Sequence, residues 1–344
     1  MTGLRARHRV GRFTAAALGL ALGASIGAAP ASASPVVARE GGAAFQAGRS
    51  APPAWLLTGG RRFAVDTQAV TLTSGDAADV YVPRVGRAER ARLTDAFPVI
   101  ALLQGANVDK RFYSGVAGGV AAQGFVVVVP NRLRPPQTPP PGLFTSPAVV
   151  TAVLETATTL DGDATSPLYR VTDTGSLGLL GHSFGGAVGL FAAAGVCEPP
   201  LCAPPFARPP QLRAAALYGT NIATGTTLDR DLDTSGVAVA LVQGTVDGVA
   251  PPVEAATTYP SLERPRALIS IRGANHYGIT DVDDPAGALP DPNDPTIPQQ
   301  TSVALVARWS GLWLRSRLLD DPFAATALKV KAATHRGAVS VRLD

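Results

Sequence analysis

A short apolar run near the middle of the chain ends in the pattern Gly-x-Ser-x-Gly and continues into small residues, over residues 176–187 (SLGLLGHSFGGA). This arrangement predicts a strand, a sharp turn and a helix, because such a turn holds the hydroxyl of its central residue, Ser183, out above a sheet. Gly181 and Gly185 flank the turn, where side chains would collide, and Gly186 lets the helix pack closely. The N-terminus of the helix carries partial positive charge, which would stabilise negative charge that develops on an oxygen beside Ser183.

Short apolar runs alternate with helical patterns along the chain. The segments expected as strands are 63–72, 78–82, 97–103, 125–129, 176–180, 214–218, 237–242 and 268–271. The segments expected as helices are 110–123, 146–160, 185–196 and 302–319. This alternation predicts the α/β class, with a mostly parallel, doubly wound sheet that carries helices on both faces and is preceded by two antiparallel strands.

One catalytic domain is expected over residues 55–322, followed by a C-terminal tail at 323–344. The gap between the strands expected around residues 214 and 237 is short, so no large lid is expected. Trp309 and Trp313 are four residues apart on the last expected helix and are expected to anchor the core.

The first 33 residues have the three parts of a secretory signal peptide. Residues 1–12 are basic, residues 13–29 are apolar and uncharged, and the small residues at 31–33 match the pattern that signal peptidase accepts. The apolar run of about 17 residues is at the lower limit for crossing a membrane, so retention as an anchor is the alternative to cleavage after Ala33. A paired Arg-Arg is absent, which favours the general secretory route. Residues 34–54, rich in Gly, Ala and Pro, are expected to form a flexible leader.

Two cysteines lie close together in the run CEPPLC. Outside the cytoplasm disulfides persist, so Cys197 and Cys202 are expected to form one bond that pins a turn, with a pair of buried thiols as the alternative. Two sulfur atoms do not fill the coordination shell of zinc. The run Asp229-x-Asp231-x-Asp233 resembles the start of a calcium loop but lacks the Gly and Glu needed further on, so no metal is expected.

Charge and composition exclude several classes of protein. The chain has 30 basic and 26 acidic residues, and the excess lies in Arg5, Arg7, Arg9 and Arg12 of the expected signal peptide. The balanced remainder has no general reason to bind nucleic acid. A hydrophobic content of 46% excludes a disordered chain. No later segment reaches membrane-spanning length without a charge or a proline, so no stable span is expected once the signal is removed.

A serine hydroxyl is a poor nucleophile unless a base takes its proton, and histidine is the natural base at neutral pH. The chain has four histidines. His8 leaves with the signal peptide, His182 points elsewhere on the turn, and His335 lies beyond the last long helix. His276 remains, in a glycine-bearing loop after the strand at 268–271, and is the expected base. A merely structural, hydrogen-bonded loop histidine is the alternative.

The base needs a carboxylate that fixes its tautomer and stabilises its charged form. Asp247 is the sole acid in its loop before Glu254, which is expected on the next helix. The acidic, proline-rich run 281–298 is expected to be a solvated surface loop, and its place directly after His276 leaves open whether it borders the site. The expected order along the chain is therefore nucleophile, acid and base: Ser183, Asp247 and His276.

Two hydrogen-bond donors are needed to hold the oxyanion of a tetrahedral intermediate. The backbone N–H of Phe184 is one candidate. The other is expected in the loop 104–107 (QGAN), where the N–H of Ala106 is preferred. Candidates for lining the substrate pocket are Gln104, Tyr113, His182 and Tyr277, although burial on a helix face is an equal alternative for Tyr113.

Three segments carry a resemblance to a known superfamily: FPVIALLQGANVDKRFYSGVAGGVAAQGFVVVVPN, VQGTVDGVAPP and GANHYG. With the Gly-x-Ser-x-Gly turn, they resemble serine esterases of the α/β-hydrolase superfamily over residues 63–319. The first segment is similar to the chlorophyllase-like branch, near the platelet-activating-factor acetylhydrolases and the bacterial cutinase-type polyester hydrolases. The resemblance implies the α/β-hydrolase fold and hydrolysis of carboxylic esters without a cofactor.

The sequence therefore predicts a secreted, extracellular and monomeric serine esterase that acts on a small-molecule or polymeric ester through an acyl-enzyme. Three alternatives remain open: an acyltransferase with the same triad, a non-catalytic binding protein on the same fold and, more weakly, a peptidase. Substrate, acyl length and oligomeric state are not encoded in the pattern.

Overall fold

A computed structural model of the chain describes residues 62–86, 96–134, 141–198, 202, 206–334 and 337–344. All of them fall in one unit, residues 48–344. The expected signal peptide (1–33) and leader (34–54) lie outside the described residues.

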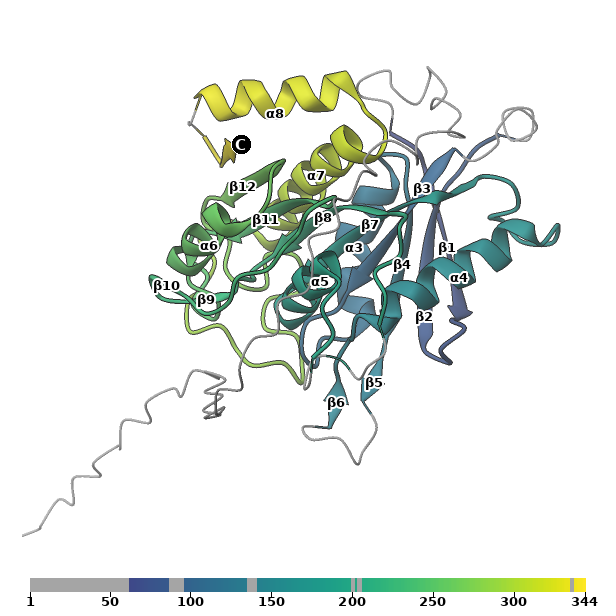
Figure 1. Cartoon of the computed structure of the whole chain (residues 1–344), viewed down its shortest axis with the longest axis horizontal. Coiled ribbons are helices and arrows are strands. Elements are labelled where there is room, and N and C mark those ends of the chain that lie inside the picture. Colours follow the sequence, from purple (N-terminus) through teal and green to yellow (C-terminus); the bar gives the residue numbers. More distant parts are fainter. Residues whose placement is uncertain (1–61, 87–95, 135–140, 199–201, 203–205, 335–336) are drawn as a thin grey trace, which may run out of the picture. The chain divides into compact units, whose positions relative to one another are not determined.

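Nine strands of the described part form one mostly parallel sheet, in the order β1-β2-β4-β3-β7-β8-β11-β12-β13 (Figure 1). The strands are β1 (Val65–Thr71), β2 (Ala77–Pro83), β3 (Phe97–Leu103), β4 (Val126–Asn131), β7 (Thr172–His182), β8 (Leu212–Tyr218), β11 (Ala238–Gly244), β12 (Arg266–Ile271) and β13 (Val339–Leu343). The strands from β4 to β12 are parallel. As expected, the two leading strands are antiparallel to their neighbours.

The connections between the strands carry the helices. They are η1 (Lys110–Tyr113), α3 (Ser114–Ala121), α4 (Ala148–Gly162), α5 (Phe184–Ala194), α6 (Pro252–Thr258), η2 (Tyr259–Ser261), α7 (Gln299–Leu318) and α8 (Pro322–Thr334). Two small hairpins complete the described part: β5 (Leu133–Arg134) with β6 (Gly142–Leu143), and β9 (Ala223–Thr224) with β10 (Thr227–Leu228). Only the second hairpin lies between β8 and β11, so no large helical lid occupies that connection.

Helices cover both faces of the sheet, as two glycines of β7 show. A Cβ added at Gly178 would lie 2.8 Å from Leu318 of α7, whereas one added at Gly181 would lie 2.8 Å from Gly186 of α5. Residues three apart in a strand point to opposite faces. α7 and α5 therefore pack on opposite faces, and the predicted α/β class with a mostly parallel, doubly wound sheet is confirmed.

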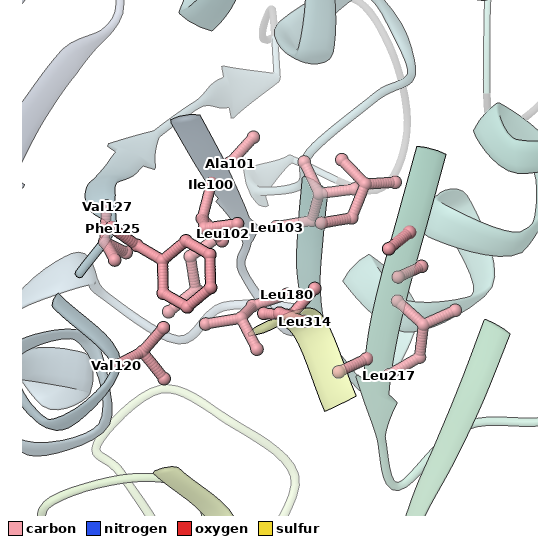
Figure 2. Close-up of a cluster of buried hydrophobic side chains, with 14 of the residues drawn as sticks. Ile100, Ala101, Leu102, Leu103, Val120, Phe125, Val127, Leu180, Leu217 and Leu314 are labelled. Carbon is pink, nitrogen blue, oxygen red and sulfur yellow. The ribbon is translucent and has the colours of Figure 1, made fainter. Parts of the chain in front are cut away.

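The core is built from strands that are apolar throughout. The predicted strand 97–103 is β3, and every residue of β3 and β11 is buried. Strands covered on both faces need no polar alternation, which is why the sequence reads as an unbroken apolar run. Figure 2 shows side chains from β3, α3 and α7 in one cluster, among them Leu102, Val120 and Leu314.

The prediction that residues 323–344 form a C-terminal tail is wrong. This segment forms most of α8 and all of β13, and β13 pairs antiparallel with β12 as the last strand of the sheet. Within β13, Val339 and Val341 are buried, whereas Arg342 is exposed. So short an alternating run is too weak a pattern to predict a strand, but pairing with β12 stabilises it. The boundary at residue 322 does not separate the domain from a tail.

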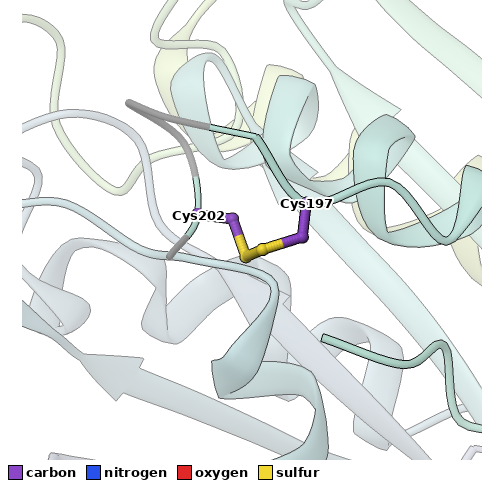
Figure 3. Close-up of a disulfide and its surroundings, with 2 residues drawn as sticks. All are labelled: Cys197 and Cys202. Atoms are coloured by element: carbon purple, nitrogen blue, oxygen red, sulfur yellow. A yellow bond between two sulfur atoms is a disulfide. The ribbon is translucent and has the colours of Figure 1, made fainter. Parts of the chain in front are cut away.

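The predicted disulfide between Cys197 and Cys202 is present and follows the end of α5 (Figure 3). The two Cα atoms are 5.0 Å apart. A loop of this size contributes little entropic stabilisation, so the bond mainly fixes the local turn.

No helix among the described residues is both long enough and apolar enough to cross a membrane.

Trp313 of α7 offers a test of the packing between this helix and the sheet. Its side chain is fully buried, and its indole N–H donates to the carbonyl of Ala215 on β8 at 3.0 Å. Trp313→Ala is expected to lower the free energy of unfolding by about 3–5 kcal/mol, because it removes a large core side chain and its hydrogen bond. Phe323→Ala on α8, where the ring is 60% exposed, is expected to change it by less than about 0.5 kcal/mol. Urea unfolding of both variants measures the difference, and equal effects would contradict the packing described.

Candidate active site

Ser183 lies at the turn between β7 and α5 in a strained backbone conformation. Its φ and ψ angles are 52° and −123°, a region that side-chain-bearing residues rarely adopt. The surroundings hold it there: its N–H donates to the carbonyl of Tyr218 at 2.9 Å. The residue is partly exposed, so its hydroxyl is accessible from outside.

The close approach of α5 to β3 shapes this turn. A Cβ added at Gly185 would collide with the carbonyl oxygens of Leu103 and Gln104. Only glycine leaves room for the helix to begin against the end of that strand. Ser183 lies two residues earlier in the same turn, and we attribute its strained backbone conformation to this close packing.

The three residues of the expected triad lie in a hydrogen-bonded row. His276 Nε2 is 2.8 Å from Ser183 Oγ, and His276 Nδ1 is 3.0 Å from each carboxylate oxygen of Asp247. Asp247 and His276 are each 2% exposed. They follow β11 and β12, whose carboxyl ends meet that of β7 at one edge of the parallel sheet, so residues far apart in sequence come together.

The carboxylate of Asp247 is surrounded by N–H donors. The backbone N–H groups of Val249 and Ala250 donate to one oxygen at 3.0 and 2.7 Å, and the side-chain amide of Gln243 donates to the other at 3.1 Å. These bonds replace water around a buried charge and fix the direction of the carboxylate. Gln243 was not predicted, although its place at the carboxyl end of β11 is a usable signal.

A second buried acid, Asp291, joins the loops of the acid and the base. Its carboxylate accepts the backbone N–H of His276 at 2.7 Å and that of Gly248 at 3.1 Å. The hydroxyl of Tyr218 donates to the carbonyl of Asn275 at 2.5 Å, which holds the same loop from the sheet. Asp291 is 9% exposed.

For the run 281–298, the expectation of a solvated surface loop holds only in part. Several of its side chains are exposed, but the run borders the site and supports it. Besides Asp291, Asp283 accepts from the side chain of Asn275 at 2.9 Å, and Asp281 accepts the backbone N–H of Gly115 at 2.9 Å at the start of α3. An acidic, proline-rich composition predicts an exposed loop, but it does not indicate which distant residues the loop contacts.

The two expected oxyanion donors, Ala106 and Phe184, have N–H groups that are not used within the described chain. In the loop after β3, the N–H of Gly105 donates to the hydroxyl of Tyr113 and that of Asn107 donates to the carbonyl of Leu143. No acceptor among the described residues takes the N–H of Ala106. Phe184 is the first residue of α5, where an N–H has no acceptor within the helix.

The four candidates for lining a substrate pocket are all buried. Gln104, Tyr113, His182 and Tyr277 are between 0% and 3% exposed, and their polar atoms bond to other parts of the protein. The ring of His182 contacts the rings of Tyr113 and Tyr277.

Two aromatic side chains that were not predicted as pocket residues, Phe184 and Phe144, lie beside Ser183 or next to its neighbour. The ring of Phe184 meets that of Phe144 edge-on, with 5.3 Å between the centroids, and the Arg134 guanidinium lies 4.3 Å from the Phe144 centroid. Phe184 is partly exposed and therefore offers an apolar surface next to Ser183.

Within the described part of the chain, no group of three or more His, Cys, Asp or Glu side chains is arranged to hold a metal ion. Comparison with models of known protein families finds no match for this sequence, and comparison with curated proteins finds none either.

Two glycine variants test whether the turn depends on the approach of α5 to β3. Gly185→Ala is expected to lower the free energy of unfolding by about 3 kcal/mol, because backbone atoms of β3 cannot move away easily. Gly118→Ala on α3 is the matched control. Its Cβ would meet nothing within 4 Å, so alanine is expected to add about 0.5–1 kcal/mol of stability. Urea unfolding compares the two variants. Wild-type stability of Gly185→Ala would show that the turn does not depend on this close approach.

Proposed function

We propose that this protein is a secreted serine hydrolase with the α/β-hydrolase fold that cleaves carboxylic esters. One observation carries the proposal: the row of hydrogen bonds from Asp247 through His276 to Ser183. The serine stands at a strained turn before a helix, and nucleophile, acid and base follow one another in the chain order of that fold.

In the proposed reaction, Ser183 Oγ attacks the ester carbonyl while His276 Nε2 takes its proton. Asp247 accepts the Nδ1–H of His276, which keeps Nε2 free to act as the base and stabilises the imidazolium. The N–H groups of Ala106 and Phe184 hold the oxyanion of the tetrahedral intermediate. His276 then gives its proton to the leaving alcohol, and an acyl-enzyme remains. A water molecule, activated by His276, releases the acid.

The site favours short acyl esters or the ends of polymeric esters. Ser183 is partly exposed, and only a small hairpin connects β8 to β11, so nothing in that connection encloses a long acyl chain. Phe184 supplies an apolar surface at the nucleophile. We expect the enzyme to act as a monomer and without a cofactor.

Export through the general secretory route is part of the proposal and rests on residues 1–33. The disulfide between Cys197 and Cys202 supports it, because such bonds persist mainly in oxidising compartments.

A fluorophosphonate probe tests whether Ser183 is an activated nucleophile. The wild type is expected to be labelled and to hydrolyse p-nitrophenyl esters, fastest with short acyl chains. Ser183→Ala is expected to lose both properties, since no hydroxyl remains to attack. Ser235→Ala, in an exposed loop, is the control and should keep both. An unlabelled wild type would favour a binding protein. Preferred transfer of the acyl group to an added alcohol would indicate an acyltransferase.

Replacing the acid tests the role of Asp247. Asp247→Asn keeps the shape but donates toward His276 Nδ1, so the imidazole takes the wrong tautomer, and kcat is expected to fall by about 10³–10⁴-fold. Asp231→Asn removes one negative charge from an exposed loop and is expected to leave kcat unchanged. Steady-state kinetics on p-nitrophenyl acetate compare the two. A wild-type kcat for Asp247→Asn would remove this residue from the mechanism.

A further inference from the structure

His182, the residue before the nucleophile, is fully buried between two loops of the candidate site. Its Nδ1 lies 2.9 Å from the hydroxyl oxygen of Tyr113, and its Nε2 lies 3.0 Å from the carbonyl oxygen of His276. The same Tyr113 oxygen lies 2.8 Å from the backbone nitrogen of Gly105. A continuous line of hydrogen bonds thus runs from Gly105 to His276.

Chemistry fixes the direction of every bond in this line. The His276 carbonyl can only accept, so His182 Nε2 carries the proton and, in the neutral ring, Nδ1 is an acceptor. The hydroxyl of Tyr113 therefore donates to Nδ1, and its lone pair accepts the N–H of Gly105. The Tyr113 hydroxyl donates one bond and accepts another, each of the other groups makes one bond, and no donor faces another donor.

Burial keeps both side chains in these forms. Desolvation, together with the nearby His276, holds the pKa of His182 well below its usual range, despite the opposing hydrogen bond to the His276 carbonyl. Desolvation likewise raises the pKa of Tyr113 above its usual range. His182 stays neutral and Tyr113 keeps its proton at neutral pH.

We propose that Tyr113 and His182 form a positioning relay, which couples the loop of the oxyanion donor Ala106 to the loop of the base His276. The inference rests on the proposed function. Gly105 immediately precedes Ala106, so fixing the peptide at Gly105 fixes where the next N–H points. At the other end, the relay holds the backbone of His276, whose side chain must meet the nucleophile.

Two features make the relay specific. The first is tightness: a Cβ added at Gly105 would lie 2.7 Å from His182 Nδ1, so the loop and the ring are in direct contact. The second is that both ring nitrogens of His182 are engaged, so this histidine does not compete with His276 as a base. An oxyanion donor must lie about 2.7–3.1 Å from the oxyanion, and its loss lowers the rate by about 10²–10³-fold, so small displacements matter.

Tyr113→Phe tests the relay by removing one hydroxyl while keeping the ring. The N–H of Gly105 and His182 Nδ1 then have no partner, and the loop of Ala106 loses its anchor. We expect kcat, measured per active site titrated with the fluorophosphonate, to fall by about 10-fold to 100-fold, with KM within about twofold. Affinity for a boronic acid, which forms a tetrahedral adduct with the serine, is expected to fall in parallel. Tyr81→Phe on β2 is the control, because the Tyr81 hydroxyl makes no hydrogen bond within the described residues.

A double-mutant cycle shows whether the two side chains act as one unit. His182→Gln can still donate toward the His276 carbonyl but has no acceptor placed for Tyr113. If the relay exists, the double variant loses no more activity than the worse single variant. Independent, multiplying losses would overturn it.

The outcomes separate this inference from the proposed function. A wild type that neither hydrolyses esters nor reacts with the probe defeats the proposed function itself. An active wild type whose kcat per titrated site is unchanged by Tyr113→Phe defeats the relay alone. A purely structural role would lower the number of titrated sites and leave kcat per site and boronic acid affinity intact, which also overturns the relay.

Discussion

The close packing of the start of α5 against the end of β3 is the constraint on which the site depends. Glycine at position 185 allows the two backbones to touch, and this contact leaves Ser183 in a conformation that an unsupported turn would not keep. The same contact brings the loop that contains Ala106 beside the turn of Ser183. One steric condition thus determines the positions of both the Ser183 hydroxyl and the nearby backbone N–H groups.

Around this fixed point, buried polar groups join loops that the chain separates widely. Asp291 bridges the loops of Asp247 and His276, and Tyr113 with His182 bridges the loops of Gly105 and His276. These buried hydrogen bonds add directional restraints to the apolar packing of the loops and so help to define their relative positions. These bonds restrain the loops of Asp247 and His276, whose side chains must keep a fixed geometry if a proton is to be transferred.

The sequence pattern predicted the features that interactions between neighbouring residues determine. The unbroken apolar run of β3 and the turn at Ser183 are readable because burial on both faces and a tight turn each restrict residue type. The pairing of Asp247 with His276 followed from their places after successive strands. Asp291 could not be found in this way, because its partners lie 15 and 43 residues away and its composition resembles that of exposed loops. β13 was missed because only pairing with β12 makes so short a run a strand.

The positive φ of Ser183 has an evolutionary meaning as well as a mechanical one. Glycine would adopt this geometry without penalty, so a chain selected only for robustness would drift toward glycine at this position. Under the proposed function, selection for reactivity would keep a hydroxyl-bearing residue at this strained point of the backbone. A relative without that function would then be expected to carry glycine here.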